Sequence, residues 1–110
     1  MEFEPGDKAI DGAIAMEAIF LADGKPELTY RLRVRAARFL GTSIKEREMI
    51  SASIKDFYDL RSAIVHGSKD ASGIVGAGEI VEAGLNYVQS AARRICEAGE
   101  MPDWGALELG

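Results

Sequence analysis

Apolar residues recur at helical spacing along most of this 110-residue chain. Spacings of three and four residues predict four helices, each bounded by residues that start or stop a helix. Pro26 suits a first helical turn, Gly41 and Gly67 suit helix ends, and Ser43 with Glu46 has the spacing of a capping box. The predicted helices span residues 7–22, 27–40, 43–66 and 79–98.

The second of these segments carries a conflicting signal. In "LTYRLRVRA", residues 28–36, apolar and polar side chains alternate strictly, which is typical of a half-buried strand. A helix instead gathers Leu28, Leu32 and Phe39 on one face. A lone strand would also leave its backbone groups unpaired. We therefore expect a helix here.

Helices joined by short connections predict an all-α fold, a bundle of four main helices in up-and-down order. The length suits one domain, residues 1–110. We expect its core to cover residues 7–98 and residues 99–110 to form a C-terminal tail anchored by Trp104.

The composition, 47% hydrophobic and 28% charged, is typical of a globular chain and excludes a disordered one. No run of residues is apolar enough to cross a membrane, and the acidic N-terminus lacks the features of a signal peptide. One cysteine and one histidine provide neither an internal disulfide nor the ligands of a zinc site. We therefore expect no metal, no cofactor and no membrane partner, and a cytoplasmic location.

The net charge of −5 is unevenly distributed. Residues 25–69 hold ten Lys or Arg against five Asp or Glu, whereas the two flanks together hold three against thirteen. A basic centre could bind a polyanion, or the acidic flanks could neutralise it within the fold. In the second predicted helix, Arg31 and Arg35 lie beside core positions, so we expect ion pairs with the first and fourth helices. Arg33 and Arg38 remain candidates for contacts with RNA phosphates.

The only histidine, His66, follows Arg61 by five residues near the end of the third predicted helix. Arg61 lies about 40° around the helix from the apolar Phe57, so its charge needs a partner. That partner could be Glu17 of the first helix, or a phosphate gripped by a rigid guanidinium. His66 could cap the helix end, or it could transfer protons near neutral pH.

Arg61 and His66 do not converge on a regular helix, because they lie about 140° apart around its axis. They could share a site if the helix end unwinds, or if a second copy of the chain closes the site about a two-fold axis.

"RSAIVHG", residues 61–67, resembles the Arg-x4-6-His signature of the HEPN superfamily. Three segments, "EAIFL", "LTYRLRVRAARFLG" and "FYDLRSAIVHG", occur in the order found in the Apea-like HEPN branch. The resemblance covers residues 13–95. It implies a HEPN-like helical bundle that forms homodimers, with the motifs of both subunits meeting at the interface.

The resemblance also implies a function, because many HEPN domains are metal-independent endoribonucleases, often of toxin–antitoxin or defence systems. By this resemblance Arg61 holds the scissile phosphate and His66 acts as general acid and base. Ser62 takes the position after the arginine, where Asn, Asp or His is commoner in proven nucleases. The substrate-binding residues expected beside them are Arg33, Arg38 and Tyr58.

The partners that the resemblance implies are a second copy of the chain, RNA, and an antitoxin or other protein from a neighbouring gene. The alternative is a non-catalytic HEPN module that binds RNA, a nucleotide or a protein and acts through dimerisation.

Overall fold

The computed structural model describes residues 5–21, 28–66 and 74–109. Within these ranges the chain forms α1 (Pro5–Phe20), α2 (Leu28–Leu40), α3 (Ile44–Val65), α4 (Ala77–Ala98) and α5 (Trp104–Leu109). No strand occurs in these ranges, so the predicted all-α bundle is confirmed. The segment 28–36, with its alternating pattern, is helical. None of the helices in the described ranges is long and apolar enough to cross a membrane.

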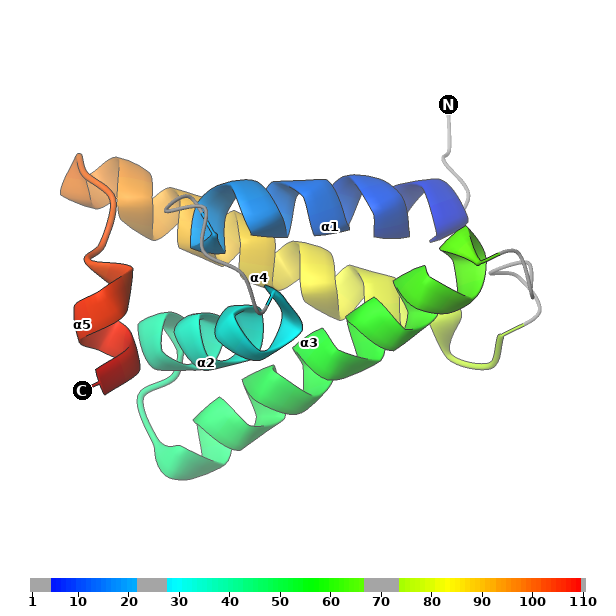
Figure 1. The fold of residues 1–110 in the computed structure, drawn as a ribbon, viewed down its shortest axis with the longest axis horizontal. Coiled ribbons are helices and arrows are strands. Elements are labelled where there is room, and N and C mark those ends of the chain that lie inside the picture. Colours follow the sequence, from blue (N-terminus) through cyan, green and yellow to red (C-terminus); the bar gives the residue numbers. More distant parts are fainter. Residues whose placement is uncertain (1–4, 22–27, 67–73, 110) are drawn as a thin grey trace.

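The four long helices pack around one core, and α5 covers α2 (Figure 1). The neighbours α1 and α4 lie side by side and run in the same direction, whereas α3 crosses them in the opposite direction. In an up-and-down bundle of four helices, α1 and α4 would run in opposite directions. Here α3 and α4 run in opposite directions, but α1 and α4 do not. α2 packs on α3, and the two form one side of the molecule.

Phe57 of α3 lies at the centre of the core and has no exposed surface. Two glycines on the neighbouring helices make room for its ring. A Cβ atom at Gly84 of α4 would lie 2.3 Å from the ring's Cδ2 atom, and one at Gly12 of α1 would lie 2.8 Å from its Cζ atom. Because protein interiors are close-packed, these two positions admit no side chain without displacing the ring.

Local hydrogen bonds fix both ends of α3. The backbone N–H of Glu46 donates to the Ser43 hydroxyl at 3.1 Å, as the capping-box spacing predicts. At the other end the His66 backbone N–H donates to the Ser62 carbonyl at 3.0 Å. The helix therefore ends where the sequence indicates, while Gly67 lies outside the described residues.

The expected tail is part of the fold. Residues 104–109 form α5, and Trp104 is only 4% exposed. Its ring packs edge-on against Phe20 of α1 and Phe39 of α2, each with a centroid distance of 5.3 Å. Trp104 is the expected anchor, and the core extends beyond the predicted limit at residue 98.

Candidate functional site

Arg61 lies half-buried on the C-terminal half of α3. Its guanidinium carbon is 5.9 Å from the centroid of the Tyr58 ring, and its Nε atom is buried without a hydrogen-bond partner. Among the described residues it forms no ion pair, so the pairing with Glu17 considered from the sequence is not formed. Arg61 lies beside the apolar stripe of α3, as its spacing from the buried Phe57 predicts. The partner that its charge requires is not found within this part of the chain.

Tyr58 lies in the core, not on a substrate-binding surface. It is 6% exposed, and its hydroxyl donates to the Ala13 carbonyl of α1 at 3.3 Å. Burial raises the pKa of the Tyr58 phenol well above its ordinary value, and the Glu17 carboxylate raises it further, against the opposing charge of Arg61. Tyr58 therefore stays neutral, and its burial leaves little of the side chain open to a substrate. Its ring supports Arg61 instead.

Ser62 and His66 are both exposed on the last turns of α3. His66 follows the helix as its C-cap residue, and its backbone, rather than its imidazole, makes the capping hydrogen bonds. Arg61 lies toward Tyr58, whereas His66 lies in solvent at the helix end. One copy of the chain thus holds the two motif residues on the same helix end without bringing them together.

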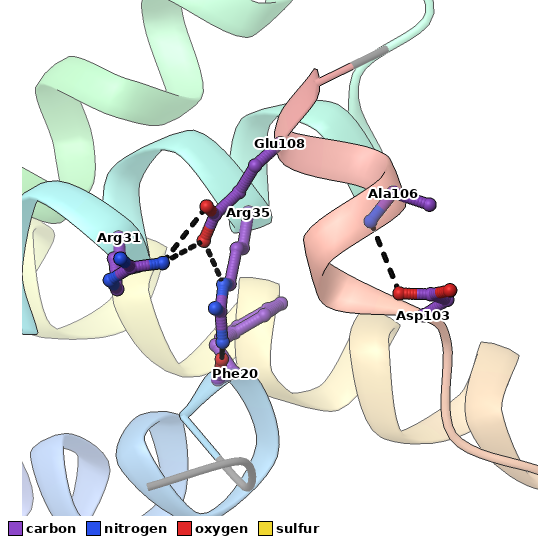
Figure 2. A network of polar contacts seen from close by, with 6 residues as sticks. All are labelled: Phe20, Arg31, Arg35, Asp103, Ala106 and Glu108. Atoms are coloured by element: carbon purple, nitrogen blue, oxygen red, sulfur yellow. Dashed lines mark hydrogen bonds and ion pairs between the residues drawn. The ribbon is translucent and has the colours of Figure 1, made fainter. Parts of the chain in front are cut away.

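Arg31 and Arg35 of α2 form ion pairs, and the carboxylate that the structure describes as their partner lies on α5 instead of on α1 or α4. Both bind Glu108 of α5, as Figure 2 shows. Arg31 donates from one terminal nitrogen to both carboxylate oxygens, at 3.0 and 2.9 Å. Arg35, which has no exposed surface, donates through Nε to Glu108 at 2.5 Å and through a terminal nitrogen to the Phe20 carbonyl at 2.6 Å. These two arginines are structural.

The pKa of the Glu108 carboxyl reflects this position. Burial by itself would raise that pKa, but the hydrogen bonds and positive charges of Arg35 and Arg31 outweigh it and hold the pKa below its ordinary value. Glu108 is therefore ionised near neutral pH and neutralises the guanidinium groups of Arg31 and Arg35.

Arg33 and Arg38, the expected RNA contacts, lie on the part of α2 that faces α3. Both line a groove of about 670 Å³ between α2 and α3. Arg47 of α3 and the exposed Tyr30 line the same groove, and sequence reasoning did not select either. Spacing could have indicated them, because the lining positions recur at i, i+3, i+4, i+7 and i+8 along both helices. Those positions are 30, 33, 34, 37 and 38 on α2 and 44, 47, 48, 51 and 52 on α3.

No family model, curated protein or solved structure matches this chain. The HEPN resemblance therefore rests on the three sequence segments quoted above. Across the described ranges, no group of three or more His, Cys, Asp or Glu side chains is placed to hold a metal ion.

Proposed function

We propose that this chain is a metal-independent endoribonuclease of the HEPN type that acts as a homodimer. The observation that supports this most is the state of Arg61. Its side chain is half-buried over the Tyr58 ring, and its guanidinium makes no hydrogen bond or ion pair with a described residue, although a partly desolvated charge is costly to leave unpaired. A phosphate oxygen is the partner that a guanidinium binds best. Arg61 is therefore suited to a phosphate of the substrate.

In the proposed reaction Arg61 binds the scissile phosphate and stabilises the negative charge that develops on its oxygens. His66 removes the proton from the 2′-hydroxyl, whose oxygen attacks the adjacent phosphorus. The bond to the 5′-oxygen breaks, and that oxygen receives the proton back from the His66 imidazolium formed in the first step. The products are a 2′,3′-cyclic phosphate and a 5′-hydroxyl. The exposed Ser62 hydroxyl would hydrogen-bond the phosphate or the imidazole.

The homodimer is needed because of the directions of the two motif residues. Arg61 and His66 lie about 140° apart around α3, so one protomer offers half of a site on each face. A two-fold axis beside the end of α3 would place Arg61 of one protomer opposite His66 of its partner. Each dimer would then hold two equivalent sites.

Cleavage of labelled single-stranded RNA by the purified chain, with a metal chelator present, tests the activity. We expect a cyclic phosphate product, and its loss in Arg61→Ala and in His66→Ala. Val65→Ala is the matched control, since Val65 is 52% exposed and precedes His66 on the same turn. Cleavage that survives His66→Ala, or no cleavage across a broad set of RNA sequences, would contradict the proposal.

Mixing the two inactive variants tests the shared site. A mixed dimer of Arg61→Ala and His66→Ala contains one site with both residues intact if each site draws on two protomers. Activity should then return to about a quarter of the wild-type value after subunit exchange. If both residues of a site came from one protomer, the mixture would stay inactive.

A second candidate function is a non-catalytic module that binds RNA or a nucleotide and acts through dimerisation. The observation that favours it is the exposed Ser62 at the position where an amide or carboxylate is commoner in proven nucleases. It predicts RNA binding that Arg61→Ala weakens, with no cleavage by the wild-type chain. Ser62→Asn then discriminates further, because it would raise cleavage only in a latent nuclease.

The biological setting that we propose is a cytoplasmic toxin–antitoxin or defence system. In that setting the protein from a neighbouring gene would cover the exposed end of α3, where Ser62 and His66 lie. Co-purification of the two proteins, with nuclease activity lost at an equimolar amount of the partner, would support this arrangement. Full activity in the complex would contradict it.

A further inference from the structure

The groove between α2 and α3 lies apart from the motif of the proposed nuclease. Its lining on α3 runs from Ile44 to Ala52, whereas Arg61 and His66 lie on the last turns of that helix. At 1.5 Å per residue, about 21 Å of helix axis separates Arg47 from Arg61. The groove is therefore a second candidate site, separate from the residues of the proposed cleavage reaction.

The arginines of this groove are held in place at their inner ends. Arg33 donates through Nε to the Ser51 hydroxyl at 3.0 Å, and Arg47 donates through Nε to the Gly41 carbonyl at 3.2 Å. The terminal nitrogens of both side chains make no hydrogen bond or ion pair with a described residue, and neither does Arg38. Guanidinium groups fixed at Nε with free terminal nitrogens suit bidentate binding of an anion.

The local charge also favours an anion. Two carboxylates, Glu48 and Glu108, line the groove beside its three arginines. Glu108 is already bound by Arg31 and Arg35, so its charge is compensated within the fold. The positive charge of Arg33, Arg38 and Arg47 then faces one uncompensated carboxylate, which leaves the groove electropositive.

Apolar and aromatic surface lies next to these arginines. Tyr30 is 71% exposed and Ile44 is 74% exposed, and both line the groove. Aromatic rings beside cationic groups are the combination that binds nucleotides, because a base stacks on the ring while the phosphate meets the cations. An inorganic anion makes only the contact with the cations and does not stack on the ring.

We propose that the α2–α3 groove binds a nucleoside phosphate, with the phosphate between Arg33 and Arg47 and the base against Tyr30. Such a group occurs in a free nucleotide and in single-stranded RNA. RNA bound here would extend the substrate contacts of the proposed nuclease, but the binding is measured without cleavage and does not rest on it.

The test compares three probes on the full chain: inorganic phosphate, adenosine monophosphate and a fluorescent single-stranded oligoadenylate. The probe variant is Arg33→Gln with Arg47→Gln, and Arg93→Gln of α4 is the matched control because Arg93 is exposed and lies outside the groove. We expect the double variant to weaken nucleotide binding roughly tenfold or more, and Tyr30→Ala to weaken it roughly tenfold, with the control unchanged.

The probes also distinguish the source of the nucleotide. Oligoadenylate that binds much more tightly than the monophosphate, with an affinity that falls steeply with salt, supports a nucleic acid strand. Equal affinities support a free nucleotide. Undiminished binding by the double variant, or phosphate that binds as tightly as the monophosphate, overturns the inference. Binding of adenosine monophosphate by the wild-type chain separates the two proposals, since the groove should bind it even if the chain cleaves no RNA.

Discussion

The buried guanidinium of Arg35 is neutralised by Glu108, 73 residues further along the chain (Figure 2). The arginine has no exposed surface, while the glutamate side chain retains 23% of its exposure at the edge of α5. A charge so deeply buried is tolerated only when it is paired and hydrogen-bonded. The position of α5 is thus fixed from two sides, by this ion pair and by the Trp104 ring between Phe20 and Phe39.

We predict that Glu108→Gln destabilises the fold by about 1–3 kcal/mol, because it leaves the Arg35 guanidinium with a weaker, neutral acceptor. Chemical unfolding followed by circular dichroism measures this free energy. Glu100→Gln is the matched control, since Glu100 is exposed and has no ion pair among the described residues. If the two variants unfold at the same denaturant concentration, the pair contributes nothing to stability.

Acid should abolish the same contribution. The pKa of Glu108 is lower in the folded chain than its ordinary value of 4.5, so the folded state favours the ionised carboxylate. Its stabilising effect is complete above that ordinary value and disappears as the pH falls through the lower, folded pKa. The difference in unfolding free energy between wild type and Glu108→Gln should therefore shrink steadily below about pH 4.5. A difference that stays constant from neutral pH into this acid range would contradict the prediction.

The four long helices could be predicted from the sequence because their signals are local. The apolar spacing lies within each helix, and Gly41 and the Ser43 cap directly adjoin the helices that they bound. Residues 28–36 show where the local pattern was misleading. Their strict alternation does not follow burial, because the polar Arg35 is buried and the apolar Tyr30 is exposed, while Leu32 and Ala36 belong to the core.

The position of α5 and the partner of Arg35 had no such signal. A helix of six residues is too short for a periodic pattern, and it is held by contacts that join opposite ends of the chain. The same reason explains the groove, because pairing α2 with α3 decides which arginines meet. Arg33 and Arg38 were selected on one helix, but Arg47 joins them only through the packing of two. The burial of Tyr58 could not be predicted either, because an aromatic ring suits both a core and a binding surface.

Two glycines of α4 provide a matched pair of substitutions to alanine. We predict that Gly84→Ala destabilises the chain by about 1–3 kcal/mol, since the new methyl group would overlap the Phe57 ring in a closely packed core. Gly78→Ala should instead stabilise it by about 0.5–1 kcal/mol, because a Cβ atom there meets nothing within 4 Å and alanine favours the helix. Thermal and chemical unfolding of the two variants measures both effects. Equal shifts in the same direction would show that α4 does not approach Phe57 as closely as described.

Alkaline conditions should destabilise the fold through Tyr58. Burial and the Glu17 charge raise the pKa of its phenol above the ordinary value of 10.0, so the unfolded chain loses this proton more readily than the folded chain does. The contribution of Tyr58 to stability is thus complete below pH 10.0 and is lost as the pH rises toward the folded pKa.

Tyr58→Phe should cost about 0.5–1.5 kcal/mol at neutral pH, since it removes the hydrogen bond to the Ala13 carbonyl. It should also flatten the decline in unfolding free energy above pH 10.0. An equally steep decline in wild type and Tyr58→Phe would show that this phenol titrates alike in both states.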